Sequence, residues 1–127
     1  MTDHPTPKLN TWCHIEILGK TEDQTKQLQS FYGDTFGWKF QHVPEMNYTL
    51  YSTAEGGIGG GSFTLPEGEN PGCLVNYISV EDIDASCAEI EKNGGATVMP
   101  KKEVPGAGWM AWVKDPADNL FALWKQS

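Results

Sequence analysis

Two residues near the start of the chain, His14 and Glu16, have side chains that can exchange protons with a substrate. They stand in the stretch "WCHIEIL", where Cys13, Ile15 and Ile17 alternate with them in a spacing that predicts a β-strand. Residues i and i+2 of a strand share a face, with Cβ atoms roughly 6.5–7 Å apart, so one small molecule can touch both. A carboxylate beside an imidazole shifts the pKa of both groups, as in general acid–base pairs. The pair is therefore either a proton-transfer site for a carbonyl or hydroxyl compound or a hydrogen-bonded pair that orders the strand.

The stretch "GWMAWVKDPADNLFALWKQ", residues 108–126, is unusual because it is apolar on both faces. Its centre, residues 115–119, has the Asp, Pro and Asn of a turn, and the extended segments on either side predict a β-hairpin. A hairpin with one face in water alternates apolar and polar residues, and this one barely does. One face can pack on a helix. We expect the other face to line a pocket for a small molecule, and contact with a partner subunit is the alternative.

The first half of the chain predicts five elements that position His14 and Glu16. After the first strand, residues 21–24 match a capping box and start a helix that stops at Gly37. Three strands follow, at 38–43, 48–52 and 58–65. The order is β-α-β-β-β.

The second half repeats this order and supplies the hairpin. A strand begins at Cys73, a helix ends before Gly94, and a strand at 96–102 leads into the hairpin. Residues 66–72 carry Pro, Gly and Asn and are typical of a linker. The chain is therefore predicted to be one α+β domain over residues 1–127. It contains two tandem βαβββ modules, at about 10–65 and 73–126, whose mixed sheet curls around a cleft.

The composition argues against several classes of partner. The net charge is −8, and all nine basic residues are Lys, so the Arg fork that recognises phosphate and guanine is missing. An acidic surface repels nucleic acid and anionic membranes, and we expect neither as a partner. The sequence has no run of roughly 20 apolar residues and no apolar signal-peptide core at its N-terminus. Three cysteines without CxxC spacing predict free thiols and a cytoplasmic location.

Several short motifs, taken in order, resemble the glyoxalase/bleomycin-resistance/dioxygenase group, the vicinal oxygen chelate superfamily. They are "HIEI", "FYGDTFGW", "GGIGGG", "ISVEDIDASCAEIEKNGGATV" and "VPGAGWMAWVKDPADNLFALW", and they run from about Trp12 to Trp124. The chain is most similar to short, glyoxalase-like members. The resemblance implies two βαβββ modules, usually in a homodimer, with a cleft for a metal ion or a small organic ligand. It leaves open whether the cleft forms within one chain or across the dimer.

The resemblance also implies one metal ligand from the first strand and one from the last strand of each module. The matching positions are His14, about Gly60, about Val75 and Ala122. Only His14 among them can bind a divalent metal, whereas catalytic zinc takes three protein ligands and non-haem iron two His and one carboxylate. We therefore expect no metal or other cofactor. A different metal site, formed by His14, Glu16 and His42, remains an alternative.

The last-strand position of the family faces the cleft, so the resemblance implies that aromatic residues near Ala122 contact the ligand. Alternation adds Tyr77 from the strand that begins at Cys73 and Trp12 from the strand of His14, and a bulge in the turn at 115–119 would bring Met110 and Trp112 to the same face. The predicted ligand-binding residues are Trp12, Tyr77, Met110, Trp112, Leu120 and Trp124. Such side chains suit a flat, moderately apolar molecule, and the tyrosine hydroxyl offers a polar contact.

Three functions are compatible with these observations. The one we favour is binding of a small, partly apolar organic molecule in an aromatic cleft, in the bleomycin-resistance manner and without the usual metal quartet. The second is a lyase- or isomerase-type enzyme that uses His14 and Glu16, with or without a divalent metal. The third is an accessory or structural dimeric subunit whose apolar faces are dimer contacts. Family likeness alone does not establish chemistry.

Overall fold

The structure is a computed structural model that describes residues 7–46, 48–64 and 74–127. It divides into two compact units. One unit is His14–Val75, and the other combines Asn76–Ser127 with Met1–Cys13. Each unit is described by itself. The predicted linker at 66–72 lies outside the described residues.

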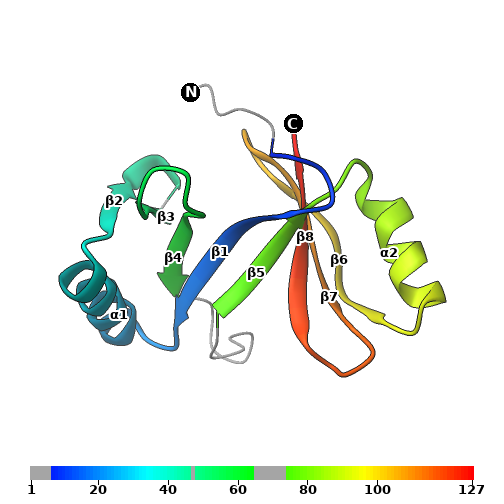
Figure 1. The fold of residues 1–127 in the computed structure, drawn as a ribbon, viewed down its shortest axis with the longest axis horizontal. Coiled ribbons are helices and arrows are strands. Elements are labelled where there is room, and N and C mark those ends of the chain that lie inside the picture. Colours follow the sequence, from blue (N-terminus) through cyan, green and yellow to red (C-terminus); the bar gives the residue numbers. More distant parts are fainter. Residues whose placement is uncertain (1–6, 47, 65–73) are drawn as a thin grey trace. The chain divides into compact units, whose positions relative to one another are not determined.

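The unit His14–Val75 holds the first βαβββ module (Figure 1). Its elements are β1 (Trp12–Gly19), α1 (Glu22–Phe36), β2 (Lys39–Val43), the short 3-10 helix η1 (Pro44–Met46), β3 (Tyr48–Ser52) and β4 (Gly60–Thr64). The Thr21 hydroxyl accepts a hydrogen bond from the backbone N–H of Gln24 and so caps the start of α1. Gly37 ends the helix with a φ of 75°, in the left-handed region. The predicted start and stop of this helix are confirmed.

The sheet of this unit has the strand order β2-β3-β4-β1, with β1 parallel to β4 and the other neighbours antiparallel. Helix α1 covers the face that carries Ser62 and Thr64, whose hydroxyls bond to its side chains. Ile17 lies opposite Ser62 in the register, and Glu16 lies opposite Gly61. Because successive strand residues point to opposite faces, Glu16 and Gly61 lie on the face away from α1. We call the face of each module's sheet that lies away from its helix the distal face.

The unit that contains Asn76–Ser127 holds most of the second module. Its elements are β5 (Leu74–Ser79), α2 (Ile83–Lys92), β6 (Ala96–Val104), β7 (Gly108–Lys114) and β8 (Leu120–Gln126). The strand order is β5-β8-β7-β6, with β5 parallel to β8 and the other neighbours antiparallel. In the β7–β8 turn, the Asp115 carboxylate accepts hydrogen bonds from the backbone N–H groups of Ala117 and Asn119. The hairpin predicted at 108–126 is confirmed.

The helix side of the second module is its hydrophobic core. The buried residues are Val80, Ile83, Ala111, Val113 and Leu123, with Ile78, Cys87, Ile90, Trp109 and Phe121 packed around them. One face of the hairpin therefore packs with α2, as expected. The alternate hairpin residues belong to the distal face.

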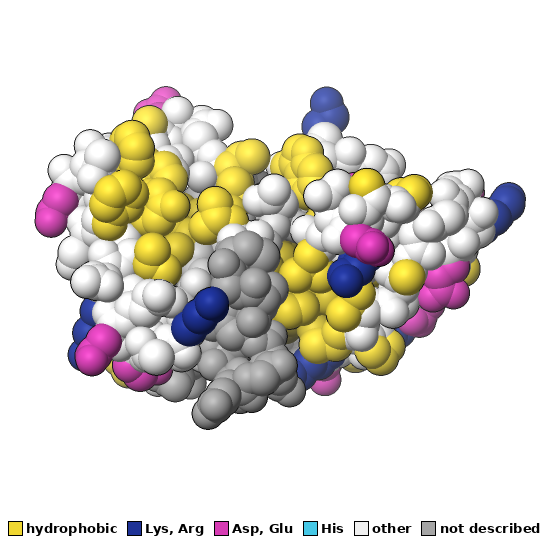
Figure 2. Space-filling model, turned by 90° about the horizontal axis from the view of Figure 1, so that it is seen from below, with side chains coloured by type: hydrophobic (Ala, Val, Ile, Leu, Met, Phe, Trp, Pro, Cys, Tyr) yellow, Lys and Arg dark blue, Asp and Glu magenta, His cyan; other side chains and the backbone are white. Residues whose placement is uncertain are grey.

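The α1 side of the first module is built from stacked aromatic rings. Consecutive ring centroids lie 5.0, 5.4 and 5.3 Å apart in the series Tyr32, Trp38, Tyr51 and Phe40. Phe31 and Phe36 border this stack and are each more than half exposed. Figure 2 shows hydrophobic side chains exposed together over this unit. This surface is more apolar than the acidic composition would indicate.

These observations confirm the α+β class and the two βαβββ modules. Some boundaries differ from the predictions: β2 begins at Lys39, β4 begins at Gly60, and β6 continues to Val104. Neither α1 nor α2, the α-helices in the described part of the chain, is long and apolar enough to cross a bilayer. The closure of the sheet around a cleft stays a prediction.

Candidate functional site

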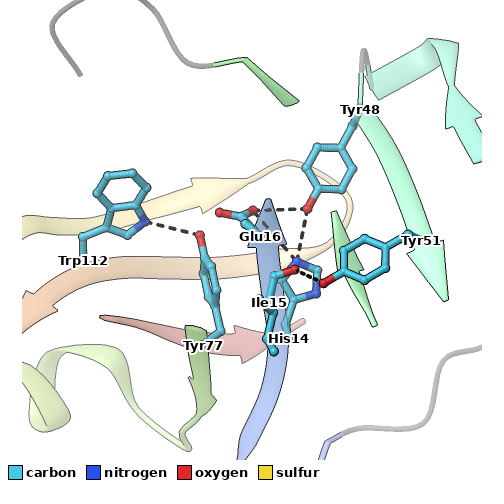
Figure 3. Close-up of polar contacts among 7 residues, drawn as sticks. All are labelled: His14, Ile15, Glu16, Tyr48, Tyr51, Tyr77 and Trp112. Carbon is cyan, nitrogen blue, oxygen red and sulfur yellow. Dashed lines mark hydrogen bonds and ion pairs between the residues drawn. The ribbon is translucent and has the colours of Figure 1, made fainter. Parts of the chain in front are cut away.

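Strand β1 places His14 and Glu16 together on the distal face of the first module (Figure 3). Nε2 of His14 lies 3.9 Å from Oε2 of Glu16. The His14 side chain is 30% exposed and that of Glu16 is 9% exposed. The two residues are therefore close enough to interact, and His14 is the one that a molecule from solvent can reach.

Tyr48 of β3 completes this group, and the sequence interpretation missed it. Its hydroxyl donates a hydrogen bond to Oε2 of Glu16 at 3.1 Å and lies 3.1 Å from Nε2 of His14. Gly61 makes room for the ring, because a Cβ at this position would overlap the Tyr48 hydroxyl and ring carbons. The glycine-rich run "GGIGGG" was the available signal, since it indicates close approach of another group.

Burial lowers the pKa of His14 to about 4, from an ordinary value of 6.5. The carboxylate of Glu16 acts in the opposite direction, because a negative charge at 3.9 Å favours the imidazolium. Burial is the larger effect. His14 is therefore neutral at pH 7, and its contact with Glu16 runs through the Tyr48 hydroxyl rather than through an ion pair.

The distal face of the second module carries five of the six predicted ligand-binding residues. The register pairs Tyr77 with Ala122, Trp112 with Ala122, Met110 with Trp124 and Lys114 with Leu120. Side chains at paired positions share a face, so Tyr77, Met110, Trp112, Leu120 and Trp124 lie together. The indole N–H of Trp112 donates a hydrogen bond to the Tyr77 hydroxyl at 3.3 Å. Tyr77 and Trp112 are buried, and the other three are partly exposed.

The sixth predicted residue, Trp12, does not join this set. Its ring is half exposed and packs edge-on against Phe121, with centroids 6.2 Å apart. Phe121 precedes Ala122 on β8 and packs with the core on the α2 side.

The structure does not bring His42 beside His14 and Glu16, as the predicted alternative metal site requires. His42 lies opposite Thr49 in the register and its Nδ1 is 3.1 Å from the Thr49 hydroxyl. Thr49 and Tyr48 are adjacent on β3, so their side chains point to opposite faces of the sheet. His42 is therefore on the α1 side, away from Glu16. Among the residues that the structure describes, no three His, Cys, Asp or Glu side chains are grouped closely enough to hold a metal.

The residues present also do not fit the metal quartet that the resemblance implies. The position on β4 that shares the distal face with His14 is Gly61, not Gly60, since a Cβ on Gly60 would point at the Ile15 backbone. The space beside Gly61 holds the phenol of Tyr48 instead of a ligand side chain. Val75 and Ala122 are apolar and fully buried.

Two hollows in the unit that contains Asn76–Ser127 lie away from the predicted residues. The larger, about 580 Å³, is lined by Leu9, Asn10, Glu81, Asp82, Ala85, Ser86, Glu89 and Lys125. The smaller, about 170 Å³, lies between the end of α2 and the β7–β8 turn. Both are shallow and border α2, on the helix side of the sheet, so neither corresponds to the predicted aromatic cleft.

The cysteines are free thiols, as predicted, for the two that the structure describes. Burial raises the pKa of Cys13 to about 11, which keeps its thiol protonated and a poor nucleophile. Cys87 is part of α2 and packs against the core of the second module. Cys73 lies outside the described residues.

The paired βαβββ modules define this chain as a glyoxalase-type domain. The chain belongs to the Glyoxalase/Bleomycin resistance protein/Dioxygenase superfamily, whose family model matches residues 14–123. The resemblance drawn from the sequence motifs is confirmed.

Two curated relatives share this likeness over most of the chain. The chain is 30% identical over 113 residues to "Putative glyoxylase CFP32" of Mycobacterium bovis and equally to that of Mycobacterium tuberculosis. The match covers 84% of this chain and 42% of each relative, so the chain spans less than half of their length.

Solved structures support the fold at low sequence identity. A glyoxalase/bleomycin resistance protein/dioxygenase superfamily member from Vibrio splendidus is 15% identical, with a TM-score of 0.61 and coverage of 91% of this chain and 100% of that one. Methylmalonyl-CoA epimerase from Mycobacterium tuberculosis is 15% identical, with a TM-score of 0.64 and coverage of 98% and 93%. At this identity the likeness concerns the fold alone.

Proposed function

We propose that this domain binds a small, partly apolar organic molecule on the distal face of the second module, without a metal ion. The observation that carries the proposal is the shared face of Tyr77, Met110, Trp112, Leu120 and Trp124. Flat aromatic surface, an adaptable methionine and a tyrosine hydroxyl are the usual components of a site for an apolar ligand with one polar group.

The burial of the individual residues supports a division of roles. Tyr77 and Trp112 are buried and hydrogen-bonded to each other, so they form a rigid base. Met110, Leu120 and Trp124 are partly exposed and are the residues that a ligand touches. Rigid aromatic side chains are already ordered before a ligand binds, so binding costs them little conformational entropy.

Tryptophan fluorescence tests the proposal with a panel of small aromatic compounds. A binder should change the emission and should lose at least tenfold in affinity in Trp124→Leu. Trp109→Leu is the matched control, because Trp109 lies on the same strand pair but faces α2. Equal loss in both variants, or no response of the parent across the panel, would contradict the assignment of this face.

A second candidate function is a lyase- or isomerase-type enzyme that uses His14 and Glu16. The observation in its favour is the hydrogen-bonded group of His14, Tyr48 and Glu16, which links an accessible imidazole to a buried carboxylate. The name of the mycobacterial relatives also supports it. An enzyme should lose turnover in His14→Ala while its circular dichroism and unfolding transition stay those of a folded protein.

We also propose that the domain forms a homodimer in the cytoplasm. The exposed rings of Phe31 and Phe36 give the first module an apolar surface of the kind that subunits cover. The free thiols of Cys13 and Cys87 favour a reducing compartment. A monomer in light scattering at 100 µM would remove the dimer from the proposal.

A further inference from the structure

A groove runs along one side of α2, on the helix side of the second module's sheet. The two hollows beside α2 meet at Glu89, which lines both of them. Asp82, Ser86, Glu89 and Asn93 recur every three or four residues, so they form one stripe along the helix. The larger hollow follows this stripe from the start of α2, and the smaller one continues it to the end. We call the two hollows together the α2 groove; its length is that of the ten-residue helix, about 15 Å.

The other wall of the larger hollow is the segment before β1, and backbone hydrogen bonds hold this segment in place. The Asn10 N–H donates to the Ser79 carbonyl at 2.7 Å, and the Ser79 N–H donates to the Thr11 carbonyl at 3.0 Å. Asn10 has a φ of 62°, in the left-handed region, and turns the chain at this point. Leu9 is 42% exposed and gives the wall an apolar surface. The α2 groove is therefore formed before any partner binds.

The smaller hollow suits one apolar side chain. It has a volume of about 170 Å³ between Ile90 of α2, Pro116 of the β7–β8 turn and Phe121 of β8. This is room for a single side chain of the size of leucine or phenylalanine. Apolar anchors in small pockets carry much of the binding free energy at protein interfaces.

The charges of the α2 groove are not balanced within the described part of the chain. There the groove is lined by four carboxylates and one ammonium group, those of Glu81, Asp82, Glu89, Asp115 and Lys125. Asp82 and Asp115 accept hydrogen bonds from backbone N–H groups. Glu81 and Glu89 are exposed, and neither forms an ion pair with a described residue. A partner that brings positive charge is therefore complementary to this groove.

The other side of α2 shows the opposite arrangement. Asp84 forms an ion pair of 2.7 Å with Lys101, whose ammonium group lies 5.3 Å from the centroid of the Trp109 ring. Glu91 accepts a hydrogen bond from the Thr97 hydroxyl at 2.6 Å. The carboxylates on this side thus have partners within the chain, and the groove is the side of α2 with charge available to another molecule.

We propose that the α2 groove is a docking site for an extended peptide segment that carries lysine or arginine beside an apolar anchor. The anchor enters the smaller hollow, and the cationic side chains pair with Glu89 and Glu81. About five extended residues span about 15 Å. This surface goes beyond the proposed function, which concerns the distal face of the same sheet.

Other occupants fit the α2 groove less well. Its carboxylates repel nucleic acid and anionic membranes. A second copy of the chain that docked through the same groove would set these carboxylates against each other. A small molecule needs a pocket that buries most of its surface, and this groove is shallow.

Fluorescence anisotropy with the rhodamine-labelled peptide Leu-Lys-Gly-Lys-Leu-amide tests the proposal, with the whole chain titrated to 1 mM. We expect saturable binding by the parent and at least fivefold weaker binding by Glu89→Gln. Asp84→Asn is the matched control, because it removes the same charge from the other side of α2, and it should bind as the parent does. Replacement of both leucines of the peptide by alanine should also weaken binding at least fivefold.

Three outcomes of this titration would overturn the proposal. They are no binding by the parent, equal weakening in Glu89→Gln and Asp84→Asn, and undiminished binding of the alanine peptide. The last result would mean that the groove attracts any small polycation. A dimer in light scattering that the peptide dissociates would assign the groove to a second copy of the chain and would overturn the proposal as well.

Amide NMR of the whole chain locates the peptide independently of any variant. We expect the largest shift changes along the groove, at Ser86, Asn93 and Phe121. Changes centred on Met110 and Trp124 would place the peptide on the distal face and overturn the α2 groove as its site. An aromatic compound that binds the distal face should leave the groove amides unchanged, so the docking site and the proposed function can fail separately.

Discussion

The two modules share one frame and use their distal faces differently. Glu16 lies opposite Gly61 in the first module, and Tyr77 lies opposite Ala122 at the corresponding place in the second. In each, an aromatic side chain two strands away donates a hydrogen bond to the residue on the first strand of the module. Tyr48 donates to the Glu16 carboxylate, whereas Trp112 donates to the Tyr77 hydroxyl. The first face therefore holds a charge and the second an apolar, neutral surface.

This difference shows how a repeated fold can carry a polar face in one module and an apolar face at the corresponding place in the other. Apolar burial stabilises roughly in proportion to area, so the second face can be packed tightly. A buried carboxylate requires hydrogen-bond donors and room for them, and the first face meets this need with a hydroxyl above a glycine. Three changes test this difference. They concern the packing of Trp112 on the second face, the titration of His14 on the first face, and one methyl group at the corresponding positions Gly61 and Ala122.

The largest effect is expected from Trp112→Ala on the distal face of the second module. Trp112 is 9% exposed and bonded to Tyr77, so its removal should lower the free energy of unfolding by about 3–5 kcal/mol. Urea unfolding followed by circular dichroism measures the loss. Trp124→Ala, on the same face but partly exposed, should cost less than half as much. A loss below about 1 kcal/mol for Trp112→Ala would mean that this face is not a packed base.

The next effect is a pH dependence of stability that belongs to the first module. The unfolded chain binds a proton on His14 near pH 6.5, and the folded chain does so only near pH 4. Stability should therefore be constant above pH 6.5 and fall as the pH drops toward 4, by up to about 3 kcal/mol. Glu16 and Tyr48 are the titratable groups that contact the ring.

Urea unfolding between pH 4 and 8 checks this dependence in the parent and in His14→Gln. His14→Gln should lose the fall in stability between pH 6.5 and pH 4. Trp112→Ala should be less stable than the parent at every pH but should keep this fall. Parallel curves for the parent and His14→Gln would show that His14 does not titrate as its burial requires.

Local patterns in the sequence were sufficient for the elements and for most of the faces. The family resemblance placed Leu120 and Trp124 on the cleft face, and a bulge expected in the turn at 115–119 placed Met110 and Trp112 with them. The register of the hairpin brings these four residues to one face. Alternation along the first strand placed His14 and Glu16 together. These inferences hold because a strand's period of two is fixed by backbone geometry.

The residues that the sequence did not reveal depend on long-range register. Tyr48 is more than thirty residues from its partners, and it reaches them because β4 lies between β1 and β3. The assignment of Gly60 instead of Gly61 is a shift by one residue, which exchanges the two faces. The contact of Trp12 with Phe121 and the pairing of His42 with Thr49 likewise join residues of different strands.

The smallest of the three effects concerns one methyl group at corresponding positions. In Gly61→Ala the new Cβ overlaps the Tyr48 hydroxyl and ring, so the ring must move and release Glu16 and His14. We expect a loss of about 1–3 kcal/mol. Ala122→Gly makes the opposite change and should cost about 0.5–1 kcal/mol through backbone entropy.

A double-mutant cycle of Gly61→Ala with Tyr48→Ala identifies the cause of this loss. In Tyr48→Ala the ring that the new methyl group would displace is already absent. The stability losses of the two single substitutions should therefore not add. A coupling above about 1 kcal/mol would show that the glycine is present to admit the phenol. Additive losses, with Gly61→Ala no more harmful than Ala122→Gly, would show that Tyr48 moves aside freely. The two distal faces would then differ in their side chains, but β4 and β8 would leave equal space for those side chains.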